Sequence, residues 1–248
     1  MNTYYKSYCD FQEEIKEYVI NIFGVYGKEL VLRLEEYNLL HNEKNCIESS
    51  TAIGFILEEF LVSKLEMYTH SLKKKCIVDR YDGPTTSNSY DCYSVFENIR
   101  FLINVKTEKE TFSKRGKKIV HENNAIAAIK NLHRNYCQED PDVEKCYIIL
   151  KVKYYVRDQQ EDSVYSKAKP RHLYIDDIEI YCLEEVDMLN EHQQDNRSWS
   201  KAKDDNETVN NGRLKASKAF RESHQVPEDE ISYQNTFNML ENLVKNNK

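Results

Sequence analysis

The stretch that decides the fold is SYDCYSVFENIRFLINVK, residues 89–106. It holds two runs of β-branched and aromatic residues around a short polar turn, which predicts a β-hairpin. Side chains of a strand alternate between its two faces, so Asn104 and Lys106 share one face and Val105 lies on the other. Asp91 stands directly before the first strand, thirteen residues ahead of Asn104. An acid, an amide and a lysine are thereby expected at one place.

The rest of the chain supplies helices and further strands around this hairpin of 92–96 and 99–106. A helix is predicted over 52–69, where apolar residues recur at helical spacing after a Ser-Ser-Thr start signal. The other predicted elements are helix within 1–40, a helix over 122–136, strands over 146–156 and 173–183, and a helix over 228–246. This order predicts an α/β fold with a central mixed β-sheet flanked by helices. We expect a core over 1–183 and a helical and loop region over 184–248, both parts of one domain.

The composition predicts a globular protein without a membrane segment. The 248 residues are 40% hydrophobic and 31% charged, and no apolar run approaches the roughly 20 residues of a transmembrane helix. The seven cysteines include no Cys-x-x-Cys pair, which argues against disulfides and structural zinc and for a reducing cytosol. There is no apolar signal core at the N-terminus, and frequent Lys, Asn, Ile and Tyr indicate an AT-rich coding genome. We therefore expect a bacterial, cytoplasmic protein.

The net charge of −7 opposes a general attraction to nucleic acid, but the charge is unevenly distributed. Residues 106–134 contain eight Lys and Arg against three Glu, and residues 197–221 contain seven Lys and Arg against three Asp and Glu. Such blocks can be ordinary solvated faces. Because the first block directly follows the candidate site, we interpret it as part of a groove for nucleic acid.

The residues at the hairpin fit the chemistry of phosphodiester hydrolysis. This reaction needs positive charge on the phosphate and an activated water, both of which a divalent ion held by carboxylates supplies. Asp91 offers a carboxylate, Asn104 an amide oxygen and Val105 a carbonyl oxygen, a set of oxygens that suits Mg²⁺. Lys106 would lie beside the water, and Glu58 on the preceding helix would reach the ion through water.

In this combination the chain resembles the PD-(D/E)XK nuclease superfamily, and within it type II restriction endonucleases. The matching pieces are Glu58 in its helix, Ser-Tyr-Asp ending at Asp91, and Asn104-Val105-Lys106 in place of the acid-x-Lys element. The resemblance covers about residues 50–156. It implies a restriction-endonuclease-like core, Mg²⁺ with Mn²⁺ as a substitute, a homodimer, and specific cleavage of duplex DNA.

Two residues depart from the family pattern. Tyr90 replaces proline, and Asn104 replaces an acidic ligand. Three explanations of Asn104 stay open: a site that works with a neutral ligand, an engineered substitution that binds metal and DNA without cutting, or a binding protein that has lost catalysis. Cleavage by this chain beside its Asn104→Asp variant would separate them.

DNA-binding residues are expected in the two basic blocks. Phosphates would be contacted after the site, and base edges would be read from the C-terminal region, where Asn, Arg and Lys are frequent. The predicted DNA-binding residues are Lys114, Arg115, Lys117, Lys118, Arg197, Asn211, Arg213 and Lys215.

Three functions remain in competition from the sequence. The first is a Mg²⁺-dependent, site-specific DNA endonuclease acting as a homodimer. The second is a nuclease of the same fold in repair or defence, and the third is a non-cleaving DNA-binding module with a degenerate site. Nucleotide-binding and nucleophile-elbow enzymes are disfavoured, because Gly-x-Gly-x-x-Gly, the phosphate-binding loop and Gly-x-Ser-x-Gly are all absent.

Overall fold

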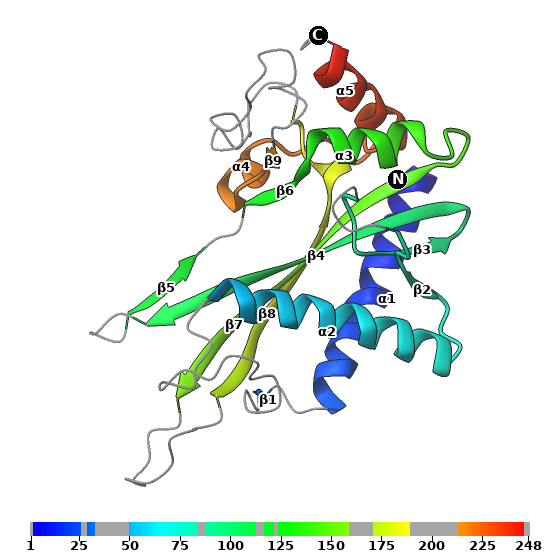
Figure 1. Cartoon of the computed structure of the whole chain (residues 1–248). Helices are drawn as coiled ribbons and strands as arrows, with labels where there is room; N and C mark the ends of the chain where they lie inside the picture. The colour runs from blue at the N-terminus through cyan, green and yellow to red at the C-terminus, as the bar shows by residue number, and fades with distance from the viewer. Residues whose placement is uncertain are drawn as a thin grey trace, which may run out of the picture.

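A twisted mixed β-sheet forms the centre of the molecule (Figure 1). The structure, a computed structural model, describes residues 2–25, 29–32, 50–83, 88–112, 117–121, 124–158, 171–188 and 213–245. Within these residues the main sheet has seven strands in the order β1-β8-β7-β4-β3-β2, with β5 paired to the far end of β4. The strands are β1 (Glu29–Leu32), β2 (Val78–Arg80), β3 (Cys92–Phe96), β4 (Ile99–Phe112), β5 (Lys118–His121), β7 (Lys145–Asp158) and β8 (Arg171–Cys182).

The sheet is mixed because one pair of strands runs parallel. The long strands β4 and β7 pair in parallel from Arg100 to Glu110, and every other pair in this sheet is antiparallel. A parallel pair needs a crossover, and here the crossover carries β6 (Ala125–Ala128), α3 (Ile129–His133) and a π-helix (Arg134–Gln138). The predicted α/β class with a central mixed sheet is confirmed.

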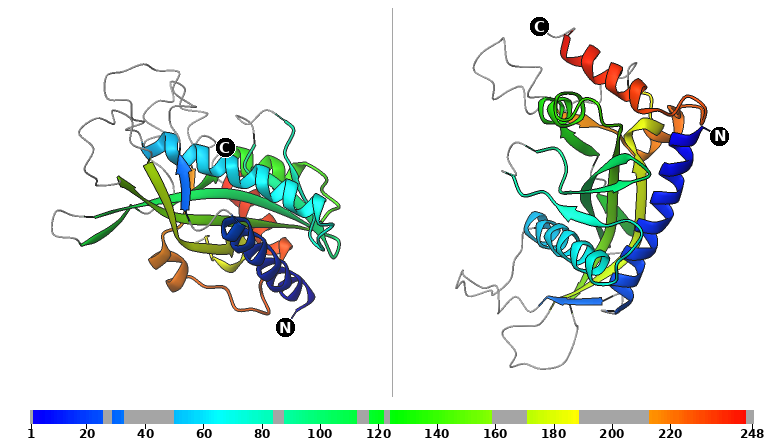
Figure 2. Two further views of the ribbon diagram at one scale, coloured as in Figure 1. Left: turned by 90° about the horizontal axis from the view of Figure 1, so that it is seen from below. Right: turned by 90° about the vertical axis from the view of Figure 1, so that its right-hand side faces the viewer.

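Side chains of β4 alternate between two hydrophobic cores. Phe101, Ile103 and Val105 belong to a first core with α1 (Thr3–Val25) and α2 (Ser50–Ser71). Leu102 belongs to a second core with the α3 segment and α5 (Tyr233–Lys245). The right-hand view of Figure 2 shows α3 and α5 lying together near the C-terminus. Because both faces are covered, β4 is apolar at the successive positions 101–103.

The predicted hairpin is formed by β3 and β4. Glu97 and Asn98 connect the strands with φ values of 49° and 66°. Two successive residues with positive φ define the type I′ turn, whose twist matches that of the flanking strands. The turn therefore sets the register that pairs Cys92 with Ile103 and leaves Asp91 next to the following residues of β4.

Several predicted boundaries are wrong. The helix predicted over 122–136 begins only at Ile129, because β6 occupies 125–128 and pairs with β9 (Arg213–Lys215) from the C-terminal region. Within the N-terminal helix prediction, 29–32 is a strand on the edge of β8. The C-terminal helix begins at Tyr233 instead of 228. After β8 a short 3-10 helix (Leu183–Glu185) and, further on, α4 (Lys218–Ser223) complete the elements, and no described helix combines the length and apolarity needed to cross a bilayer.

Candidate active site

The candidate site lies at a gap in the edge of β4. β3 pairs with β4 only as far as Ile103, and β5 pairs with it only from Lys109 onward. Between them, no strand of the described residues pairs with β4 on that side. Asp91 occupies the start of this gap: its N–H donates to the Ile103 carbonyl (2.8 Å), and its Oδ2 accepts from the Val105 N–H (2.7 Å). A carboxylate thus replaces the missing strand partner.

Glu58 of α2 fills the next position in the same gap. Its Oε1 accepts from the N–H of Thr107 (3.1 Å) and from the hydroxyl of Thr107 (3.2 Å). Gly54, one helical turn earlier, permits this approach, since a Cβ there would lie 2.6 Å from Thr107 Oγ1. The carboxylates of Asp91 and Glu58 therefore flank Lys106, one on each neighbouring backbone N–H.

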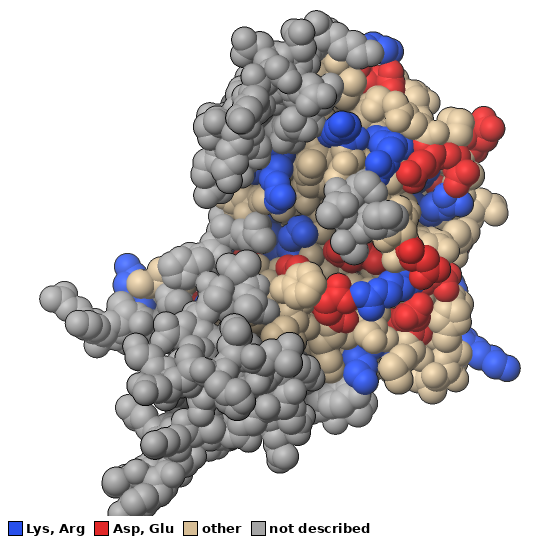
Figure 3. Space-filling view, in the orientation of Figure 1, with Lys and Arg blue, Asp and Glu red and all other residues tan. Residues whose placement is uncertain are grey.

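A cavity of about 450 Å³ opens beside this gap, lined by residues of α2 on one side and of β6 and α3 on the other. Figure 1 shows α2 below β4 and β6 and α3 above it. Asp91, Asn104 and Lys106 all line the cavity, whereas Val105 packs in the first core. Figure 3 shows basic and acidic side chains next to one another on this face of the molecule. The further lining residues are Phe55, Glu59, Val62, Arg80, Tyr81, Asn88, Ser89, Tyr90, Ile126, Ala127, Ala128, Asn131 and Arg213.

Burial and charge shift the titration of both carboxyls in the same direction. Desolvation raises the pKa of Asp91 and of Glu58, and in each case the nearby Lys106 ammonium is the charge that opposes the increase most. The Asp91 carboxylate raises the pKa of Glu58 further. Glu59, which pairs with Arg80, raises that of Asp91. Three carboxylates, those of Asp91, Glu58 and Glu59, thus lie near the two cations Lys106 and Arg80.

Asn104 is held by its amide nitrogen. Its side chain is 3% exposed, and Nδ2 donates to the Ile126 carbonyl (2.7 Å) and to the Tyr147 hydroxyl (2.8 Å). The Ile126 carbonyl can only accept, so the nitrogen must be the atom that faces it. Tyr147 in turn donates its hydroxyl to the Ser89 carbonyl. An asparagine therefore fits this position better than the acid of the family pattern, whose oxygen would face the Ile126 carbonyl.

The oxygens left over are of the kind that bind a hydrated divalent ion. Within the described residues, Asp91 Oδ1, Glu58 Oε2 and Asn104 Oδ1 accept no hydrogen bond. In a strand the N–H and C=O of one residue point to the same edge, so the Val105 carbonyl faces the gap as well. Mg²⁺ binds a few such oxygens and keeps several waters.

The predicted DNA-binding residues are only partly described by the structure. Arg213 is exposed at the start of β9 and lines the cavity, and Lys215 is half-buried in the same strand. Lys117 is exposed directly before β5, which begins at Lys118. Four of the residues lie outside the described part of the chain: Lys114, Arg115, Arg197 and Asn211.

Sequence reasoning missed the residues that position the site. Glu59 and Arg80 form an ion pair at the cavity, although the adjacent acids of α2 were a visible signal. Asn135 accepts hydrogen bonds from the Ser89 N–H and hydroxyl (both 2.9 Å), which fixes the loop before Asp91. No local pattern marks this contact, because the two residues are 46 positions apart.

Comparison of the chain with protein-family models and with curated proteins finds no match. The assignment of a function therefore depends on the geometry of the site.

Proposed function

We propose that this chain is a Mg²⁺-dependent endonuclease that cuts double-stranded DNA at specific sites, with Mn²⁺ as a substitute ion. The observation that carries the proposal is the placement of Asp91 and Glu58 on either side of Lys106 at an interrupted strand edge. Two carboxylates next to a lysine and an open cavity are what metal-assisted hydrolysis of a phosphodiester requires.

Each residue has a distinct role in this proposal. Asp91, the Asn104 amide oxygen and the Val105 carbonyl would hold the ion, with Glu58 acting through water. When bound, the ion supplies positive charge against the phosphate and makes a water more acidic. Lys106 orients the attacking water or stabilises the negative charge on the phosphorus oxygens as the bond to water forms.

The contacts of Asn104 support a site that works with a neutral ligand. Its nitrogen is committed to Ile126 and Tyr147, which leaves its oxygen for the cavity. This arrangement favours asparagine as the residue to which the site is adapted, over an acid that has been replaced.

The two strands of a duplex need two active sites, and a two-fold homodimer provides them. In the proposal, phosphates are contacted by Lys114, Arg115, Lys117 and Lys118, and bases are read by Arg197, Asn211, Arg213 and Lys215. If n phosphates are contacted, the logarithm of the binding constant falls with the logarithm of salt with a slope of about −0.9n.

The test is incubation of the full chain with a panel of plasmid and phage DNA in Mg²⁺ or Mn²⁺, followed by sequencing of the fragment ends. Discrete fragments that disappear with chelator support the proposal. Lys106→Ala should abolish cleavage, whereas Lys109→Ala should not, because Lys109 lies on the same strand outside the cavity lining.

The other outcomes separate the competing functions. A smear without defined ends indicates a nuclease of another kind, and DNA binding without cleavage indicates a non-cleaving module. The proposal is wrong if calorimetry finds no binding of Mg²⁺ or Mn²⁺ and the chain does not bind DNA.

A further inference from the structure

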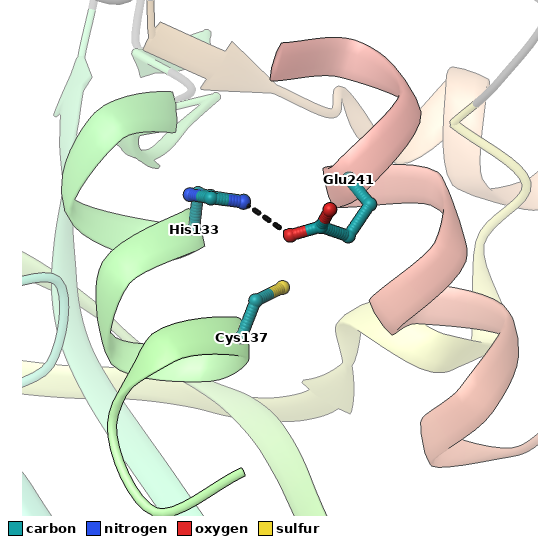
Figure 4. A group of neighbouring side chains, drawn as sticks. All are labelled: His133, Cys137 and Glu241. Carbon is teal, nitrogen blue, oxygen red and sulfur yellow. Dashed lines mark hydrogen bonds and ion pairs between the residues drawn. The ribbon is translucent and has the colours of Figure 1, made fainter. Parts of the chain in front are cut away.

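A second group of ligand-type side chains lies away from the candidate active site. His133 at the end of α3, Cys137 in the π-helix and Glu241 in α5 each offer one ligand atom, and these three atoms lie within 4.8 Å of one another. Figure 4 shows the imidazole and the thiol projecting from one helical segment toward the carboxylate of α5. The group joins two segments that are 108 positions apart in the chain.

Burial and existing contacts hold the three side chains in place. His133 is 8% exposed and Cys137 5%, and His133 Nε2 lies 2.6 Å from Glu241 Oε1. The second carboxylate oxygen of Glu241 is held by Lys245 at 2.9 Å, so the first is the one directed at the cluster. Glu241 is 24% exposed on its side chain, which leaves a route for an ion from solvent.

The local helix geometry also favours this convergence. The helix changes from α to π directly after His133, and the wider turn closes with a hydrogen bond from the Glu139 N–H to the Arg134 carbonyl (3.0 Å). π-helical turns are rare overall, but those that occur often lie at functional sites. The wider turn changes the direction in which its side chains point. Here the π turn carries Cys137 to the side of Glu241.

We propose that His133, Cys137 and Glu241 bind Zn²⁺, with water as the fourth ligand, and that this ion fastens α5 to the helix after β6. Imidazole, thiolate and carboxylate are all zinc ligands, whereas the thiolate disfavours Mg²⁺ and Ca²⁺. Bonds of about 2.0 Å at a tetrahedral angle require about 3.3 Å between nitrogen and oxygen, so the His133–Glu241 pair has to open by only about 0.7 Å. On binding, the Cys137 thiol releases its proton to solvent.

The proposal is independent of the nuclease function and differs from what the sequence predicted. The lack of Cys-x-x-Cys argued against structural zinc, but that criterion detects only ligands close together in the chain. A second cluster, Cys146, Cys182 and Glu184, is completely buried, and Glu184 already accepts hydrogen bonds from Tyr136 and Tyr147. It offers no route for an ion and serves as a control.

The test is a titration of the full chain, stripped with chelator, with Co²⁺ as a spectroscopic probe for the zinc site. We expect one equivalent of Co²⁺ to give a thiolate-to-cobalt charge-transfer band, which Zn²⁺ then removes. A cobalt ion at Asp91 has no sulfur ligand and cannot give this band. Cys137→Ser should lose the band, and Cys146→Ser should keep it.

A wild-type chain without the band, or an unchanged band in Cys137→Ser, overturns the proposal. If Cys137→Ser fails to fold by circular dichroism, Glu241→Gln replaces it, and unchanged cobalt affinity in that variant is then the refuting result. Zinc should also stabilise the fold: free Zn²⁺ at about 100 times its Kd lowers the unfolding equilibrium constant about 100-fold. This stabilisation should be absent in Glu241→Gln.

Discussion

Replacing Asn104 with aspartate tests how the candidate site is built. The family pattern suggests that Asn104→Asp restores a missing acidic ligand and increases cleavage. The contacts of Asn104 predict the opposite: the substitution removes a donor from two buried acceptors and places a negative charge at 2.7 Å from the Ile126 carbonyl. We expect a less stable protein without a large gain in activity.

The size of this effect follows from the two hydrogen bonds. Leaving a buried polar group without a partner costs about 1–3 kcal/mol. The Tyr147 hydroxyl could turn to donate to the new carboxylate, but it would then abandon the Ser89 carbonyl, so one acceptor stays unpaired in either case. Adding the repulsion from the Ile126 carbonyl gives a destabilisation of about 3 kcal/mol at neutral pH.

The assay is urea unfolding of both proteins without metal at pH 7.5 and pH 5, together with Mg²⁺-dependent cleavage. Burial raises the pKa of the new carboxyl, and its protonated form can donate to the Ile126 carbonyl, so the stability difference should shrink at pH 5. Asn238→Asp is the control: Asn238 is exposed on α5, and its Oδ1 accepts a hydrogen bond from Gln234 Nε2 (3.0 Å), which a carboxylate oxygen can also accept. Its effect should stay below about 1 kcal/mol. Equal stability of Asn104→Asp and the wild type at pH 7.5, or much faster cleavage by the variant, would refute this reasoning.

Three further predictions concern other charged side chains. Burial raises the pKa of Glu184 from 4.5 to about 7, so its contribution to stability is complete below pH 4.5 and is lost as the pH rises through 7. Glu184→Gln should remove up to about 3 kcal/mol of the stability difference between pH 4.5 and pH 8, as measured by urea unfolding, and an unchanged difference contradicts the assignment. Asp91→Asn removes one of the proposed carboxylate ligands but keeps an oxygen that can accept from the Val105 N–H, so it should weaken Mn²⁺ binding in calorimetry. Unchanged Mn²⁺ binding would count against this. Lys145 donates its ammonium to three carbonyls at 2.6–3.1 Å after the π-helix, so Lys145→Met should cost about 2 kcal/mol in urea unfolding, whereas exposed Lys130→Met should cost close to nothing.

The hairpin and the long strands were predictable because their signals are local. Alternation and β-propensity identified β3, β4, β7 and β8, and the apolar spacing of 52–69 identified α2. In these segments the local preference agrees with the final structure. The same local argument placed Asp91 beside Lys106, since the turn length fixes the register of the hairpin.

The start of the helix predicted from residue 122 was wrong because a contact between distant segments determines the structure there. The sequence Ala125–Ala128 has good helix propensity, but it forms β6 because Arg213–Lys215 pairs with it from 85 or more positions away. Pairing with a distant strand outweighs the helix propensity of residues 125–128. Neither short segment has a sequence pattern that predicts the pairing. This pairing also brings Arg213 and Ala128 to the same cavity, so part of the candidate site follows from a contact that the sequence did not reveal.

The role of Asn104 has the same physical origin. The acid-x-Lys pattern considers residue 104 only as a metal ligand. By that criterion an asparagine is a weaker ligand than an acid. In the folded chain the position also receives the Ile126 carbonyl from β6, and a carbonyl in a buried place needs a donor. An amide can donate its N–H to the Ile126 carbonyl and still offer its oxygen as the proposed metal ligand. A carboxylate could serve as the ligand but could not donate to Ile126. The hydrogen bond from Asn104 to β6 therefore gives a structural reason for an amide at this position.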